Sequence, residues 1–447
     1  MRDDITSITL PSSSKMRHNF LFGVATASFQ IEGDRHGRLP CIWDTFCEKD
    51  GAIADGSDGD VACEHILRWR DDVALMSDLG VDAYRFSVSW PRLMTKDGTL
   101  NPDGLAFYLD LLDALNQRGI KPFVTLYHWD LPQHLEDRGG WLNRDTAYAF
   151  KHYADVVSRA FKGRVHSFAT FNEPFCSAYL GYEAGVHAPG KTGRKNGRQA
   201  AHHILLAHGL AMQVLNQTSP DTLNGIVLNF TPCYPATDSD DDKLAAEKAS
   251  QYINWWYIHP LFEKSYPAIF DELPDADRPA IEPGDFDIIA QPLDFLGVNY
   301  YTRLTYSAPR NNNSFYHEHA HNAPTTDIGW EICPDAFTRL LTDLNQRYPL
   351  PPLYITENGA AFNDTTENGE VDDQQRIAYF NSHLNALHNA MEQGVDVRGY
   401  FAWSLMDNFE WAEGYLKRFG LVYVDYTTQQ RTVKASGRAY QRLLASR

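Results

Sequence analysis

Residues 83–129, which combine two predicted strands with a helix, read AYRFSVSWPRLMTKDGTLNPDGLAFYLDLLDALNQRGIKPFVTLYHW. The β-branched and aromatic runs at the two ends predict strands over Ala83–Trp90 and Pro122–Trp129. Between them, leucines recur at helical spacing over Leu105–Leu115, which predicts a helix over Pro102–Arg118. A strand, a helix and a second strand in this order are typical of a βαβ unit with parallel strands.

The same alternation continues along the chain and predicts eight pairs of a strand and a helix. The predicted strands are Phe20–Ala27, Ala83–Trp90, Pro122–Trp129, Ser167–Glu173, Gly225–Phe230, Phe295–Thr302, Leu353–Asn358 and Gly399–Leu405. The helices that follow them are Glu64–Leu79, Pro102–Arg118, Thr146–Phe161, Ala200–Leu215, Lys243–Phe262, Asp335–Tyr348, Asp373–Gln393 and Lys434–Ala445. We therefore predict an α/β fold, a (β/α)8 TIM barrel that forms one catalytic domain over residues 1–447, with its core at about 18–446. Long, aromatic-rich segments lead from strands to helices, and in such a barrel these segments build the active site at the C-terminal face.

Composition and charge limit the classes of binding partner and the cellular compartment that we expect for this protein. Forty Lys and Arg against 58 Asp and Glu give a net charge of −18, so we expect neither nucleic acid nor an anionic membrane surface as a partner. The sequence contains no run of about eighteen apolar residues, so we expect no transmembrane helix. Met1–His18 also lacks the apolar segment of a secretory signal. Six scattered cysteines without a Cys-x-x-Cys pair favour a reducing compartment, so a cytoplasmic protein is expected. The sequence leaves open whether the chain forms a homo-oligomer.

Two glutamates end predicted strands, where a barrel places its chemistry. Glu173 closes the fourth strand before Pro174, which favours extended geometry and ends the strand, and Glu357 lies at the end of the seventh strand. A single glutamate is more often a paired rim carboxylate than a catalytic one. Two of them at strand ends, each beside an asparagine, favour a pair that faces a common ligand.

Paired carboxyl groups are suited to the hydrolysis of a glycosidic bond. One protonates the leaving oxygen, and the other attacks the anomeric carbon or activates a water. A separation of ~5–5.5 Å predicts retention and ~6.5–9.5 Å inversion, and the sequence leaves the two outcomes open. Polar and aromatic side chains suited to sugar hydroxyls and ring faces are Gln30, His128, Asn172, Glu410, Trp129, Trp403 and Trp411. Core packing is the more common role of any one tryptophan, but their joint placement near strand ends favours ligand contact.

Seven ordered segments resemble the β-glucosidases of glycoside hydrolase family 1. They are Phe22–Ala27 with Gln30–Gly33, Tyr84–Trp90, Tyr127–Asp130, Asn172–Pro174, Asn299–Tyr301, Thr356–Gly359 and Trp403–Trp411. The resemblance runs in order from about residue 18 to the C-terminus. Seven segments with this order and spacing are far more specific than a lone Asn-Glu-Pro.

The resemblance implies a retaining β-glucosidase that needs no cofactor, and the sequence shows no spaced His/Cys/Asp cluster that would indicate a catalytic metal. The substrates would be cellobiose, short oligosaccharides and aryl or alkyl glucosides, with side activity on β-galactosides or β-fucosides and a place in cellulose degradation. Glu173 matches the acid/base and Glu357 the nucleophile, which Arg85 keeps ionised, and the charge of Glu357 would raise the pKa of Glu173. Matches to the residues around the sugar are Gln30, His128, Trp129, Asn172, Asn299, Tyr301, Trp403, Glu410 and Trp411, and matches on the aglycone side are Phe175 and Trp330. The family often has a cis peptide at the step that matches Trp403-Ser404.

Two alternatives remain at this stage. A 6-phospho-β-glucosidase usually lacks the glutamate that matches Glu410 and carries a tyrosine where this chain has Phe419, although Lys417 matches its lysine. A buried Glu410 carboxylate would also repel a 6-phosphate. A non-catalytic sugar-binding barrel would be favoured if Glu173 or Glu357 were replaced, and both are present.

Overall fold

The computed structural model describes residues 7–311, 314–320 and 323–447 and contains a closed parallel barrel. The barrel strands are β1 (Leu21–Ala25), β2 (Ala83–Ser87), β3 (Lys121–Tyr127), β4 (Ser167–Asn172), β5 (Leu223–Asn229), β7 (Phe295–Asn299), β10 (Leu353–Asn358) and β11 (Val397–Trp403). They follow one another around the barrel in chain order, and β11 closes it by pairing with β1. All eight predicted strands and the predicted TIM barrel are confirmed. That the chain forms one catalytic domain stays a prediction.

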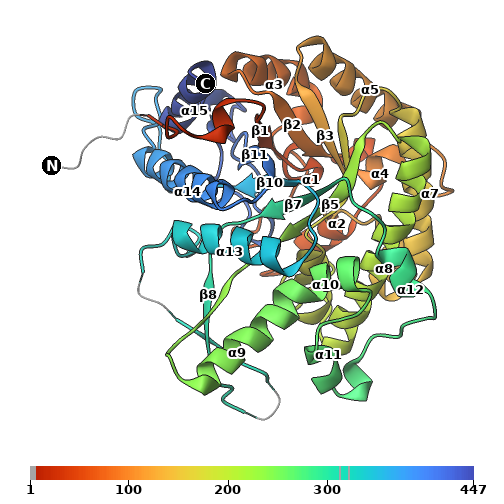
Figure 1. Ribbon diagram of the computed structural model, residues 1–447. Coiled ribbons are helices and arrows are strands. Elements are labelled where there is room, and N and C mark those ends of the chain that lie inside the picture. Colours follow the sequence, from red (N-terminus) through yellow and green to blue (C-terminus); the bar gives the residue numbers. More distant parts are fainter. Residues whose placement is uncertain (1–6, 312–313, 321–322) are drawn as a thin grey trace.

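Helices surround the strands and alternate with them along the chain (Figure 1). The main ones are α3 (His65–Leu79), α5 (Pro102–Gln117), α7 (Asp145–Ala160), α8 (Arg194–Thr218), α9 (Asp240–Ser250), α10 (Trp256–Glu263), α13 (Pro334–Arg347), α14 (Gln374–Glu392) and α15 (Ala435–Ala445). Shorter ones are α1 (Ser28–Ile31), α2 (Ile42–Cys47), α4 (Trp90–Leu93), α6 (Gln133–Glu136), α11 (Ile269–Glu272) and α12 (Asp285–Ile289). The seam between strands and helices is filled by aliphatic and aromatic side chains, as a (β/α)8 fold requires.

Two predictions were wrong in detail. The helix expected over Lys243–Phe262 is divided, because the π-helix η5 (Gln251–Trp255) separates α9 from α10. Apolar spacing predicts a helical segment but does not reveal a local change of hydrogen-bond step. The segment between the predicted strand Phe295–Thr302 and the predicted helix Asp335–Tyr348, for which no strand was predicted, contains β8 (Leu304–Ser307) and β9 (His317–His319). These form a small sheet with β6 (Cys233–Pro235), and such short, polar strands carry little alternation for a sequence pattern to detect.

Large aromatic side chains fill the barrel interior below its C-terminal end. Phe123 lies 4.9 Å from Phe401 and 5.4 Å from Tyr354, measured between ring centroids, and Phe295 lies 5.7 Å from Tyr354. Small side chains such as Ala83 alternate with them, so the interior is packed rather than hollow. The space for a ligand therefore lies at the C-terminal ends of the strands.

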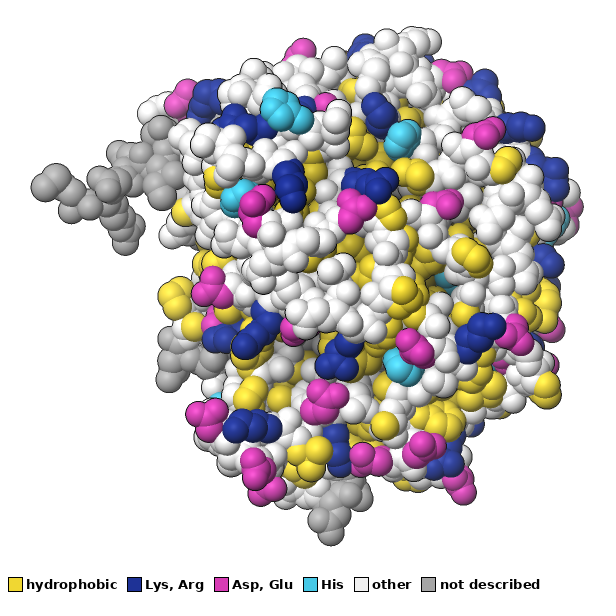
Figure 2. Space-filling model, viewed as in Figure 1, with side chains coloured by type: hydrophobic (Ala, Val, Ile, Leu, Met, Phe, Trp, Pro, Cys, Tyr) yellow, Lys and Arg dark blue, Asp and Glu magenta, His cyan; other side chains and the backbone are white. Residues whose placement is uncertain are grey.

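The surface carries charges of both signs. Figure 2 shows Lys and Arg side chains interspersed with Asp and Glu over the face in view, without a broad patch of one sign. In the described part of the chain, no helix is both long and apolar enough to cross a membrane. Residues 1–6, which belong to the segment predicted to lack a secretory signal, lie outside the described residues.

Candidate active site

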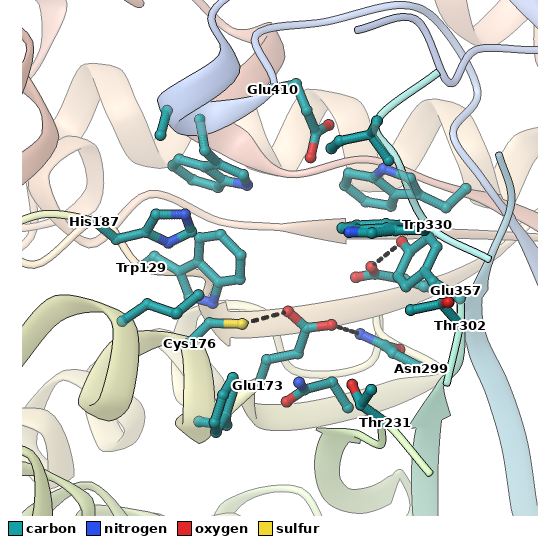
Figure 3. A pocket seen from close by; sticks show the side chains of 18 of the residues that line it. Trp129, Glu173, Cys176, His187, Thr231, Asn299, Thr302, Trp330, Glu357 and Glu410 are labelled. Atoms are coloured by element: carbon teal, nitrogen blue, oxygen red, sulfur yellow. Dashed lines mark hydrogen bonds between the residues drawn. The ribbon is translucent and has the colours of Figure 1, made fainter. Parts of the chain in front are cut away.

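A cavity of about 380 Å³ lies at the C-terminal ends of the barrel strands (Figure 3). The predicted site residues that line it are His128, Trp129, Glu173, Phe175, Asn299, Tyr301, Trp330, Glu357, Trp403, Glu410 and Trp411. They come from segments far apart in the sequence, and the closed barrel brings them to one place. The carboxyl groups of Glu173, Glu357 and Glu410 are among the polar groups that face this cavity.

Glu357 is held at the end of β10 by two hydrogen-bond donors. Ile355 of β10 pairs with Val298 of β7, and Glu357 pairs with Asn299. Strand β10 therefore has one extra residue, just before Glu357. Such an irregularity re-aims a side chain. The Arg85 guanidinium donates to Oε1 at 2.8 Å and the Tyr301 hydroxyl to Oε2 at 2.6 Å, while Glu357 is only 3 % exposed. Charge-assisted hydrogen bonds of this kind stabilise a buried carboxylate, and here they keep it aimed at the cavity.

Glu173 directly follows β4 in a strained backbone conformation. Its φ is +51°, which is rare for a residue other than glycine and typical of functional sites. The Asn299 amide donates to its Oε1 at 2.7 Å, and the Cys176 thiol donates to its Oε2 at 3.2 Å. Burial, and then the charge of Glu357, raise the pKa of Glu173 to about 8. Glu173 is therefore protonated at neutral pH and can act as an acid.

One amide, that of Asn172 at the end of β4, connects the two glutamates. Its Oδ1 accepts from Arg85 at 2.6 Å and from Asn299 at 3.0 Å, and these two residues also bind Glu357 and Glu173. Asn172 is fully buried. Buried hydrogen-bond networks restrict side-chain rotation, so the two carboxyl groups are held in fixed relation.

Several buried polar atoms around the cavity have no hydrogen-bond partner among the described residues. They include Oε2 of Glu410, Oε1 of Gln30 and Nδ1 of His128. Buried polar atoms are normally hydrogen-bonded, so unpaired ones beside a cavity are suited to the hydroxyls of a ligand. Burial, and then the charges of Glu357 and Glu173, raise the pKa of Glu410 to about 8. Burial lowers the pKa of His128 well below its usual range, so its imidazole is neutral.

Aromatic rings form the walls. Trp129 lies 4.5 Å from Trp411, and Trp403 lies 6.0 Å from the His128 ring, as centroid distances. The peptide bond between Trp403 and Ser404 is cis, as the resemblance implied. On the other side, Trp330 packs 5.1 Å from Tyr301.

Three predicted residues do not line the cavity. Gln30, Arg85 and Asn172 lie behind its wall, where Gln30 Nε2 donates to Asn408 Oδ1 at 2.9 Å and to the Phe409 carbonyl at 2.8 Å. That Gln30 and Asn172 bind substrate hydroxyls stays a prediction. Cavity residues that sequence reasoning did not select are Cys176, Leu180, His187, Asn229, Phe230, Thr231, Thr302, Leu304, Ile328, Ala412, Glu413 and Phe419. Of these, Asn229 ends β5, so the rule that selected Glu173 would have found it.

The lysine that raised the phosphorylated alternative has a protein partner. Lys417 Nζ donates to the Asp327 carbonyl at 2.9 Å and lies 3.2 Å from Asp327 Oδ2. Lys417 does not line the cavity, whereas the Glu410 carboxyl group does. The arrangement does not offer a cation to a 6-phosphate.

The model of the glycosyl hydrolase family 1 matches residues 12–447 of this chain. The chain belongs to glycosyl hydrolase family 1. Among its relatives, the β-glucosidase of Agrobacterium sp. (strain ATCC 21400) is 46 % identical over 433 residues, which cover 95 % of this chain and 94 % of the relative. The bifunctional β-D-glucosidase/β-D-fucosidase of Bifidobacterium breve is 43 % identical over 95 % of this chain and 97 % of its own length.

Solved structures of similar proteins superimpose closely on this barrel. The virulence factor SghA from Agrobacterium tumefaciens matches with a TM-score of 0.93 and 47 % identity over 95 % of this chain and 96 % of its own. SghA has also been solved in complex with its substrate analog salicin. As a member of family 1, the chain is a glycoside hydrolase.

Proposed function

We propose that this family 1 enzyme is a retaining β-glucosidase that releases terminal β-D-glucosyl residues. The observation that carries the proposal is the pair of glutamates at one cavity in different surroundings, Glu357 bound by a guanidinium and Glu173 by a neutral amide and a thiol. The relatives named β-glucosidase support glucosides as substrates, and the Bifidobacterium relative supports side activity on β-fucosides, to which we add β-galactosides. Cellobiose, short oligosaccharides and aryl or alkyl glucosides are the proposed substrates, and cellulose degradation is the proposed context.

In the first step, Glu357 attacks the anomeric carbon while Glu173 gives its proton to the glycosidic oxygen. The bond between that carbon and that oxygen breaks, the aglycone leaves as an alcohol, and the sugar is bound to Glu357 as an ester. Arg85 and Tyr301 orient the attacking carboxylate. The raised pKa of Glu173 supplies a proton at neutral pH.

In the second step, Glu173 acts as a base. The ester of Glu357 carries no charge, so the repulsion that raised the pKa of Glu173 disappears and its carboxylate becomes the stable form. Glu173 removes a proton from water, the resulting hydroxide equivalent attacks the anomeric carbon, and Glu357 leaves as a carboxylate. Two inversions at the same carbon give net retention.

The remaining site residues bind the two sides of the substrate. Around the glucosyl unit we place Gln30, His128, Trp129, Asn172, Asn299, Tyr301, Trp403, Glu410 and Trp411. Their unpaired oxygens and nitrogens suit hydroxyl groups, and their rings suit the C–H face of a sugar. Phe175 and Trp330 line the aglycone side, where flat apolar surfaces accept different leaving groups.

A cytoplasmic location is part of the proposal. All six cysteines are free, in agreement with a reducing compartment. Assembly into a homo-oligomer is compatible with this function and is not needed by a site that one chain completes.

Initial rates on three substrates test the function. The purified enzyme is assayed with EDTA on 4-nitrophenyl β-D-glucoside, β-D-galactoside and β-D-glucoside 6-phosphate. We expect the highest kcat/KM on the glucoside, because Lys417 is paired with Asp327 and does not line the cavity. Turnover of the phosphorylated substrate alone would favour the 6-phospho-β-glucosidase, and no turnover of any of them would favour a sugar-binding protein.

A further inference from the structure

Cys176 contacts Glu173 through both its backbone and its side chain. Its N–H donates to the Glu173 carbonyl at 2.9 Å, and its thiol donates to Glu173 Oε2 at 3.2 Å. It is the first residue of the π-helix η4 (Cys176–Glu183), three residues after the strained backbone of Glu173. Figure 3 shows the Glu173 carboxyl group between Cys176 on one side and Asn299 on the other. Helices of this type are frequent at functional sites.

The two oxygens of Glu173 are thus held unequally. Oε1 accepts a strong amide hydrogen bond from Asn299 at 2.7 Å, whereas Oε2 accepts only from a thiol, which is a weak donor. Burial, and then the charge of Glu173, raise the pKa of the Cys176 thiol well above its usual range. The thiol is therefore neutral throughout the range in which Glu173 titrates, and it acts there only as a donor.

We propose that Cys176 is a positioning residue for the acid and base steps, and that its thiol holds Oε2 of Glu173 as the oxygen that carries the transferred proton. This inference rests on the proposed function. A proton is more stable on the oxygen with the weaker donor, because the strong bond from Asn299 favours charge on Oε1. The protonated Oε2 still accepts the S–H bond while it donates to the glycosidic oxygen, so the thiol does not need to move during transfer.

Charged or polar groups on several other elements also surround Glu173. They are Arg85 on β2, Asn299 at the end of β7, Tyr301 after β7, Glu357 on β10 and Glu410 after β11. A substitution of Cys176 leaves all of them in place. A change in the titration of Glu173 between two variants of equal shape at position 176 therefore reports the hydrogen bond from that position.

The matched variants are Cys176→Val and Cys176→Thr, which have the same branched shape and differ in one hydroxyl donor. The measurement is kcat/KM against pH on phenyl β-D-glucoside, whose poor leaving group needs the proton of Glu173. The alkaline limb of this profile reports the pKa of the acid in the free enzyme. Without a donor, the carboxylate is less stable, so we expect the limb of Cys176→Val to lie about half a pH unit above that of Cys176→Thr. Cys176→Ala, which also lacks the donor, should shift in the same direction.

The control is Cys47→Val, since Cys47 ends α2 and does not line the cavity; its profile should match the wild type. Coincident limbs for Cys176→Val and Cys176→Thr would overturn the inference, as would a uniform fall of kcat/KM without a shift, which indicates packing alone. A wild-type enzyme without turnover would contradict the proposed function, whereas an active enzyme with coincident limbs contradicts only the role of Cys176.

Discussion

Neutralising Glu357 should lower the pKa of Glu173, the change on which the two-step mechanism depends. The substitution Glu357→Gln removes the charge while nearly preserving the shape, and so imitates the ester form of Glu357. Burial of Glu173 and its hydrogen bonds from Asn299 and Cys176 remain, so the loss of repulsion is the main change. Arg85 also loses the anion that neutralises it, which further favours a negative Glu173.

The size of the change follows from the burial of the two groups. Glu173 is 5 % exposed and Glu357 3 % exposed, so little water screens them from each other. Two unit charges ~5.5 Å apart, the separation typical of retaining enzymes, interact by ~3 kcal/mol at an effective dielectric constant of ~20. At ~1.4 kcal/mol per pH unit, the pKa of Glu173 should fall by about 2 units from its value of about 8.

Carbon-13 NMR measures this pKa directly, without turnover. Protein labelled at the glutamate side-chain carboxyl carbon is titrated, and the signal of Glu173 is identified by its loss in Glu173→Gln. The exposed Glu392 at the end of α14 provides the control, since Glu392→Gln should leave the titration of Glu173 unchanged. A pKa of Glu173 that is unchanged or higher in Glu357→Gln would refute the reasoning.

Three further predictions concern activity and stability. Azide should restore turnover of Glu173→Ala on an activated aryl glucoside and give a β-glycosyl azide; a variant that stays inactive with azide, or that turns over normally without it, would contradict the acid/base role. Lys434→Met should lower the free energy of unfolding by ~3–5 kcal/mol in urea titrations. Lys434 is fully buried, and its Nζ lies 2.5 Å from Asp364 Oδ2 and 2.6 Å from Asp407 Oδ1. A loss below ~1 kcal/mol would contradict this prediction. Burial raises the pKa of Asp130 to about 7, so the folded state binds a proton that the unfolded state releases near pH 4, and stability falls as pH rises between these values. As the pH rises from 4 to 8, the free energy of unfolding of Asp130→Asn should therefore increase by ~2–4 kcal/mol relative to that of the wild type. The same difference between the two proteins at pH 4 and at pH 8 would contradict this.

Much of the fold could be predicted because barrel strands carry a strong local signal. Runs such as those in β3 and β10 are apolar, β-branched and bounded by turns, and all eight strands followed from such runs. The π-helices were not predicted. η4 lies in the long connection between the predicted strand Ser167–Glu173 and the predicted helix Ala200–Leu215, and η5 lies inside a predicted helix whose apolar spacing does not distinguish the two helix types. The short strands β8 and β9 pair through long-range contacts that leave no local pattern.

Some residues of the candidate site could likewise be predicted from the sequence, and others could not. Glu173, Glu357 and the tryptophans at strand ends were selected because position along a strand predicts position in the barrel. Cys176 and His187 were not, because an isolated side chain in a long segment has no motif to mark it. That Gln30 and Asn172 lie behind the cavity wall depends on how loops pack over the barrel, which spacing alone does not describe.

The central claim, that Glu357 forms a covalent bond to the sugar, is tested most directly by trapping. The enzyme is incubated with 2,4-dinitrophenyl 2-deoxy-2-fluoro-β-D-glucoside. Its fluorine slows both steps, and its good leaving group speeds the first step alone, so the glycosyl-enzyme accumulates. We expect one fluorodeoxyglucosyl group per chain, and fragmentation of the modified peptide should place it on Glu357. An unmodified enzyme that still hydrolyses glucosides, or a sugar bound to another residue, would contradict the account.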